Sequence, residues 1–194
     1  MEIVKKFWWV GALAIIVFWF IGMYNGMAAK DQVVKSAWGN VESDYQRRSD
    51  LIPNLVSTVK GYADFEQETL TKVIEARASA TQVKIDASNL TPENMAAFQQ
   101  AQSGLSTSLG RLLAVAENYP NLKANQNFLD LQAQLEGTEN RISVARKRFN
   151  DAVLEFNTSI VGFPRSLVAS IGGWKEKGYF KSDEGAEKAP EVKF

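Results

Sequence analysis

Cysteine and histidine are both absent from this chain of 194 residues. Their absence excludes disulfide bonds, thiolate nucleophiles, imidazole general bases and almost every zinc or haem site. Net charge is absent too, because 22 lysine and arginine residues balance 22 aspartate and glutamate residues. Without a basic excess, the chain has no electrostatic preference for nucleic acid, and we expect no nucleic-acid partner. Hydrophobic residues make up 45% of the chain, which is enough to form a folded core.

Charged residues are missing from Phe7 to Ala29, a run of 23 residues. As an α-helix this run would be about 34 Å long, against roughly 30 Å for the hydrocarbon core of a bilayer. Trp8, Trp9 and Tyr24 stand near its ends, where aromatic residues meet the membrane surface. We therefore predict a single-pass transmembrane anchor at residues 1–29, with the lipid bilayer as its partner.

A cleaved secretory signal is the alternative interpretation of this run, because Gly26, Met27 and Ala28 loosely imitate a cleavage site. Signal sequences usually have apolar stretches of about 7 to 15 residues, which is shorter than this run, and the uncleaved anchor is therefore favoured. Lys5 and Lys6 precede the run, and the balance of charges on its two sides leans slightly toward a cytoplasmic N-terminus.

Apolar residues recur at alternating steps of three and four in three long segments, which is typical of helices packed in a coiled-coil manner. The first seam contains Val34, Trp38, Val41, Tyr45, Arg48, Ile52, Leu55 and Val59. The second contains Met95, Phe98, Gln102, Leu105, Leu109, Leu112 and Ala116. The third contains Phe128, Leu131, Leu135, Thr138, Ile142, Ala145, Phe149, Ala152 and Phe156.

Several residues mark where these helices begin, bend or end. The first seam continues past Pro53 without losing its register, which predicts one helix with a bend that continues to Lys60. Asp64 is a candidate N-cap for a further helix of about twenty residues, and Pro92 suits the first position of the next. The last long helix should end before Pro164, because proline disfavours helical geometry in the residue preceding it.

Together these patterns predict an all-α protein, in which an N-terminal transmembrane helix leads into an antiparallel up-down-up-down four-helix bundle. The bundle is predicted to cover residues 30–172, and residues 173–194 are predicted to form a flexible C-terminal tail. The first and last helices are longer than the middle two, so we expect their unpaired ends to expose Val34, Trp38 and Phe156.

A polar network is predicted at the seam of the bundle, because Arg48 occupies a core position and a buried arginine needs a partner. Glu136 or Glu139 could pair with Arg48, and Arg146 could pair with Asp50 or Glu42. The members of the predicted network are Arg48, Asp50, Asn54, Glu136, Glu139, Arg146 and Asn150. Such pairs are best attested as devices that fix the register of packed helices, and we interpret this network as structural.

Catalytic chemistry has few candidates in this sequence. A pair of carboxylates acting as acid and base is the only enzymatic reading left without histidine and cysteine, and no spacing here indicates that two carboxylates converge. The phosphate-binding patterns GxxxxGK[ST] and GxGxxG are both missing. We therefore predict no catalytic residue, no metal ligand and no cofactor.

Three stretches, in this order, resemble the LemA family of bacterial membrane-associated helical proteins. They are RRSDLIPNLVSTVKGYADFEQETL at 47–70, NLKANQNFLDLQAQLEGTENRISVARKRFNDAVLEFNT at 121–158 and GFPRSLVA at 162–169. The resemblance implies a bacterial source, an N-terminal membrane anchor and a helical bundle, and brings no enzymatic activity, cofactor or binding residue. Some members look like lipoproteins with an acylated cysteine, and here the anchoring helix must serve instead.

These observations predict a non-enzymatic scaffold or protein-interaction module in the bacterial cytoplasmic membrane, with its bundle on the periplasmic or extracellular side. Homo-oligomers are expected, and another membrane protein is a further candidate partner. A signalling or sensor accessory protein, in which the bend at Pro53 transmits strain, is the first alternative. A hydrolase that uses paired carboxylates is the second.

Overall fold

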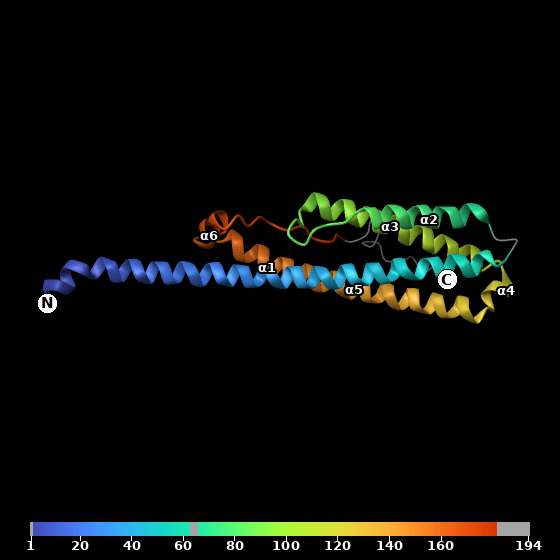
Figure 1. Ribbon diagram of the computed structural model, residues 1–194, viewed down its shortest axis with the longest axis horizontal. Coiled ribbons are helices and arrows are strands. Elements are labelled where there is room, and N and C mark those ends of the chain that lie inside the picture. Colours follow the sequence, from blue (N-terminus) through green and yellow to red (C-terminus); the bar gives the residue numbers. More distant parts are fainter. Residues whose placement is uncertain (1, 63–65, 182–194) are drawn as a thin grey trace, which may run out of the picture.

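The computed structural model describes residues 2–62 and 66–181, and all regular secondary structure in that part of the chain is helical (Figure 1). The helices are α1 (Glu2–Lys60), α2 (Gln67–Gln82), α3 (Pro92–Ala116), α4 (Pro120–Lys123), α5 (Gln126–Val161) and α6 (Arg165–Ile171). Asp64 and residues 182–194, for which we expected a helix cap and part of a flexible tail, lie outside the described residues. The all-α prediction is confirmed for the described chain.

Helix α1 runs through Pro53 as one continuous helix of 59 residues. Proline has no N–H to donate to the carbonyl four residues earlier, which leaves the Ser49 oxygen without its helical partner. Arg77 from α2 supplies the missing donor, with its Nε atom 2.9 Å from the Ser49 oxygen. The contact stabilises the helix where the proline would weaken it, and it ties α2 to α1.

Local capping chemistry explains where α3 and α5 begin. Thr91 accepts a hydrogen bond from the Asn94 N–H at 3.3 Å, and Pro92 occupies the first helical position. Asn125 caps α5 in the same way, accepting from the Phe128 N–H at 3.1 Å. The short helix α4 between them was not predicted, because four residues are too few to show a period.

The helices pack as two pairs, α1 with α5 and α2 with α3, and α6 returns to contact α1. Figure 1 shows the chain reversing direction from α1 to α2, from α2 to α3, and again from α3 to α5. The N-terminal part of α1 extends well beyond the α2–α3 pair, with α6 beside it (Figure 1). The α2–α3 pair therefore packs only along the C-terminal half of α1.

Two hydrophobic cores follow one another along α1. The proximal core, nearer the N-terminal part of α1, consists mainly of Met27, Val34, Trp38, Val41, Tyr45, Met95, Phe98, Ile142, Phe149, Val153, Phe156, Ile160, Val168 and Phe180. The distal core consists mainly of Ile52, Leu55, Val56, Val59, Leu70, Val73, Leu105, Leu109, Leu112, Ala116, Leu122, Phe128 and Leu135. Arg48 lies on α1 between the two, so a polar residue separates the cores.

The expected exposure of Val34, Trp38 and Phe156 is wrong, because each is at most 1% exposed. The covering segment follows α6 and begins within the stretch for which we expected a flexible tail. Within it Phe180 is 5% exposed and stacks near Trp38, with ring centroids 6.2 Å apart. Packing therefore extends from the helices through Lys181, and the expected flexibility does not apply to residues 173–181.

Candidate functional site

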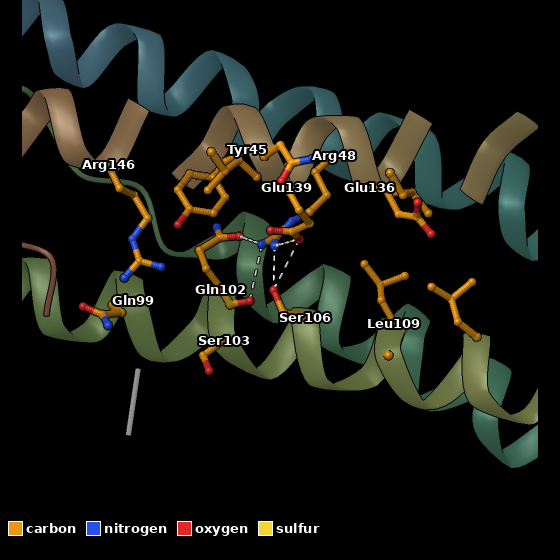
Figure 2. A pocket seen from close by; sticks show the side chains of 15 residues that line it. Tyr45, Arg48, Gln99, Gln102, Ser103, Ser106, Leu109, Glu136, Glu139 and Arg146 are labelled. Carbon is orange, nitrogen blue, oxygen red and sulfur yellow. Dashed lines mark hydrogen bonds and ion pairs between the residues drawn. The ribbon is translucent and has the colours of Figure 1, made fainter. Parts of the chain in front are cut away.

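Arg48 is the central side chain of the polar region between the two cores, and only 1% of its surface is exposed. Its Nη1 atom donates to Glu139 Oε1 at 2.5 Å and to Ser106 Oγ at 2.7 Å, and its Nη2 atom donates to Gln102 Oε1 at 2.6 Å. Figure 2 shows these side chains converging from facing helices. The Tyr45 ring lies against the guanidinium, 5.0 Å from centroid to Cζ.

We call Arg48, Gln102, Ser106 and Glu139 the arginine layer. Gln102 connects it to another helix, because its Nε2 atom donates to the backbone oxygen of Ala80 in α2 at 3.2 Å. The layer thus joins residues of α1, α2, α3 and α5. A buried charge that is satisfied only in one alignment penalises any slipped packing of these helices, which is the physical basis of a register lock.

A surface cavity of about 600 Å³ opens beside the arginine layer, between α3 and α5. The acidic side chains on its wall are Glu136 and Glu139, and the cationic ones are Arg48 and Arg146 (Figure 2). Glu139 and Ser106 are the members of the layer that reach solvent, and 44% of the Glu139 side chain is exposed. The cavity therefore contains charged groups of both signs, and its size would admit a small molecule.

The carboxylates near this cavity each have a separate local partner. Glu139 accepts from Arg48, and Glu136 accepts from Gln132 Nε2 at 3.0 Å on the same helix. Asp50 accepts from Gln46 Nε2 at 2.8 Å on the exposed side of α1 and does not line the cavity. Among the described residues, no group of three or more acidic side chains is placed to hold a metal ion.

The structure brings together only part of the predicted polar network. Arg48 and Glu139 form an ion pair, whereas Glu136 lines the cavity and accepts a hydrogen bond from Gln132. Asn54 is exposed on α1, where its backbone oxygen accepts from Thr58 Oγ1 at 2.9 Å. Arg146 and Asn150 face the chain after α6, which the sequence had not suggested as their partner.

Residues 174–181 form an extended segment, here called the C-terminal strap, that runs along α3 and α5. The side-chain amides of three helical residues each hold one strap residue by both its N–H and its carbonyl. These pairs are Asn157 with Lys177, both at 2.9 Å, Asn150 with Phe180, both at 2.9 Å, and Gln99 with Lys181, at 3.0 and 2.9 Å. Each amide makes the two hydrogen bonds that the backbone of a neighbouring strand would make.

Packing and space complete the hold on the strap. The Phe180 ring lies among the rings of Trp38, Phe98 and Phe149, at centroid distances from 5.5 to 6.4 Å. Gly178 donates to the Leu90 oxygen at 2.8 Å, and a Cβ at this glycine would lie 2.7 Å from the backbone of Pro92. Close approach therefore requires glycine at this position.

An ion pair connects the strap to α1 near the start of the packed region. Lys177 Nζ lies 2.8 Å from Asp31 Oδ1, with side chains only 9% and 13% exposed. Burial opposes ionisation of Asp31, but the hydrogen bonds from Lys177 and Lys35 outweigh it and hold the pKa of this carboxyl below its usual value. Asp31 lies beyond the uncharged run 7–29, where water can reach its surroundings.

Sequence reasoning missed Asn157 and Gln99 as members of this second polar site. Asn157 lies in a polar stripe beside the seam of α5, together with Glu139, Ser143, Arg146 and Asn150. Arg146 and Asn150 were predicted to belong to the network around Arg48, but together with Asn157 they hold the strap. The aromatic residues Trp174, Tyr179 and Phe180 in an otherwise polar tail were the available signal for a docked segment.

The described chain is all-helical, and its N-terminal helix is long and apolar enough to cross a membrane, which is compatible with a membrane-anchored protein. Comparison with protein families agrees with this class. The model of the LemA family matches residues 37–194, and the chain belongs to that family. The matched region includes the arginine layer and the strap.

Individual relatives extend the comparison to named proteins. Protein LemA of Metamycoplasma hominis is 23% identical over 157 residues, covering 81% of this chain and 68% of the relative. Magnetosome protein MamQ 2 of Paramagnetospirillum magneticum is 24% identical over 195 residues, covering 89% of this chain and 70% of the relative. Magnetosome protein MamQ of Magnetospirillum gryphiswaldense is 25% identical, covering 81% of this chain and 64% of the relative. The family match and these relatives suggest a membrane-associated protein.

Proposed function

We propose that this protein is a non-catalytic scaffold, held in the bacterial cytoplasmic membrane by one helix, that presents a helical bundle and assembles with copies of itself. In this proposal residues 7–29 of α1 span the bilayer. The rest of α1, with α2, α3 and α5, acts as one up-down-up-down four-helix bundle on the periplasmic or extracellular side.

The observation that carries the proposal is the continuity of α1. Its apolar N-terminal part is exposed, with Ile15 at 71% and Phe18 at 76%, whereas the same helix is fully buried at Val34 and Val41. Exposed apolar surface of this extent favours a lipid environment over water. A helix without an intervening linker fixes the bundle close to the membrane and limits how it can turn.

The interior chemistry supports a structural role over a catalytic one. Glu139 is engaged by the buried Arg48, and Glu136 by Gln132, so neither carboxylate stands unpaired beside the other. Acid and base work by a carboxylate pair needs two groups converging on one substrate. Pro53 is likewise stabilised by the Arg77 contact to Ser49, which favours a fixed helix over a strain-sensitive bend.

Self-assembly is assigned to the open face of the α1–α5 pair. A shallow cavity of about 530 Å³ lies along this face between Ala37 and Asn40 of α1 and Val144 and Arg148 of α5. Val33 and Val144 are 58% and 50% exposed and contribute apolar surface to this face. Small residues on α1 would let a helix of a second copy approach closely.

Cysteine crosslinking in native membranes tests this assignment, because the natural chain has no cysteine. We expect Val33→Cys and Val144→Cys to give crosslinked dimers when a short bismaleimide is added. Ile74→Cys on α2, at a residue of comparable 45% exposure, is the matched control and should stay monomeric. Equal crosslinking at all three positions, or none at any concentration, would contradict the assigned face.

A further inference from the structure

Helix α6 packs against α1 at a level that belongs to the uncharged run. Val168 and Ala169 of α6 share the proximal core with Met27, and Phe20 and Met23 pack against the same core. Trp174, just after α6, lies against Tyr24 with ring centroids 4.8 Å apart. Phe20 precedes Ala29, the end of the uncharged run, by about 14 Å at the helical rise of about 1.5 Å per residue. Contacts of α6 therefore reach into the membrane-spanning part of α1.

The outer face of α6 is apolar and bare. Phe163, in the turn just before α6, is 84% exposed, Leu167 and Ile171 on the helix are 59% and 74% exposed, and together they form an apolar stripe. Val161 at the end of α5 adds another apolar side chain that is 60% exposed. Inward residues Val168 and Ala169 alternate with this stripe, so the helix is apolar on both sides. A contiguous apolar surface of this kind indicates an interaction site.

We propose that α6 is a second membrane contact, whose stripe of Phe163, Leu167 and Ile171 inserts beside α1 into the acyl chains of the same leaflet. This inference rests on the proposed spanning of the bilayer by α1. The occupant follows from continuity, because the inward side of the same helix, at Val168 and Ala169, packs in one core with Met27 of the uncharged run. Figure 1 shows α6 beside the N-terminal half of α1, beyond the end of the α2–α3 pair.

The residues around α6 suit a position at the membrane surface. Arg165 and Lys175 stand at its two ends, and Trp174 packs on Tyr24 where an aromatic belt would lie. Lys177 and Asp31 come next in the direction of the bundle, where protein and water surround their ion pair. The α5–α6 turn would thus enter the lipid and return, and would hold the bundle at two points.

Fluorescence quenching in vesicles tests the insertion of α6. Single cysteines replace Leu167 or Ile171 in the full-length chain, are labelled with the polarity-sensitive dye NBD, and the protein is reconstituted into phosphatidylethanolamine and phosphatidylglycerol vesicles. A doxyl quencher is placed on the lipid acyl chains. Phe18→Cys within the uncharged run reports the anchor, and Leu129→Cys, 41% exposed near the start of α5, is the control far from α6.

We expect blue-shifted emission and loss of fluorescence to the doxyl lipids at Leu167→Cys and Ile171→Cys, and neither effect at Leu129→Cys. Quenching at Phe18→Cys without quenching at the α6 sites would overturn the α6 inference and leave the proposed anchor standing. No quenching at Phe18→Cys would overturn the proposed spanning helix itself. A blue shift at α6 that is insensitive to doxyl lipids and grows with protein density would assign the stripe to a second copy, and would also overturn the inference.

Discussion

The proximal and distal cores of this protein are built differently. Aromatic rings fill the proximal core, where Trp38, Phe98, Phe149 and Phe180 contact one another. The distal core is mainly leucine, isoleucine and valine from the five successive helices α1 to α5. The proximal core contains the strap, a segment without helical structure, whereas the distal core needs only the helices.

This difference shows how the protein closes each end of its helical packing. Where α1 and α5 extend beyond their neighbours, a strap with large rings covers the seam that would otherwise be bare. Where all the long helices overlap, branched aliphatic side chains interdigitate and no strap is needed. The arginine layer lies between the proximal and distal cores and fixes the register of the helices that form them.

Removing a central ring from the proximal core should have the largest effect on stability. The result should distinguish the behaviour of the proximal core from that of the distal core. Phe149→Ala should lower the free energy of unfolding by about 3–5 kcal/mol, because a fully buried ring leaves a cavity. It should also release the strap, so that trypsin cuts at Lys177. Leu112→Ala in the distal core should cost roughly 2–5 kcal/mol and leave Lys177 protected. Equal protease sensitivity in both folded variants would contradict the division into two cores.

Breaking the arginine layer should have the next largest effect. Glu139→Gln leaves the charge of Arg48 buried and should cost at most about 3 kcal/mol, the low end for a broken buried pair, because Glu139 is partly solvated. The double variant Arg48→Met with Glu139→Gln should be more stable than the sum of the single changes predicts. Strictly additive losses in thermal unfolding would mean that the two residues are not energetically coupled.

Loss of one amide hold on the strap should have a moderate effect. Asn150→Ala strands the N–H and carbonyl of Phe180, and should destabilise the protein by about 1–3 kcal/mol while the distal core stays intact. Asn54→Ala on the exposed side of α1 is the control and should change stability by less than about 0.5 kcal/mol. Hydrogen exchange of the Phe180 amide would reveal whether the strap loosens before the helices.

Acid should weaken the attachment of the strap through Asp31, with the smallest effect of this series. Because the folded state lowers the pKa of Asp31, its ionised form contributes stability above its unfolded pKa of about 4, and this contribution disappears as the pH falls through the folded value. Asp31→Asn should remove that part of the acid dependence in melting experiments between pH 7 and pH 3. Asp50→Asn, on the exposed face of α1, should retain it.

Periodicity predicted the helices because each helix buries one stripe of side chains. All seven seam residues predicted for α3 are buried, and so are all eight predicted for α1, including Arg48. In α5 the seam residues Leu131 and Ala152 remain partly exposed, because no neighbour fully covers them. The resemblance of three stretches to the LemA family was confirmed by the family match.

The strap could not be predicted in the same way. Its hold comes from the amides of Asn150 and Asn157 on α5 and from one ring, Phe180, and the strap itself has no repeating pattern that would predict a packed segment. Two glutamates one helical turn apart, Glu136 and Glu139, were predicted as possible partners of Arg48. Only the packing of the helices selects Glu139. The partner of Arg146 was predicted on α1, because no sequence pattern indicates that Lys181 returns to α5.

We propose that copies of this protein assemble in the membrane through the open α1–α5 face. The number of copies in each particle after extraction into lipid nanodiscs tests this assembly. We expect several copies for the natural chain, single copies for Val33→Lys with Val144→Lys, and several copies again for the control Ile74→Lys. Single copies of the natural chain at every protein density would contradict the account.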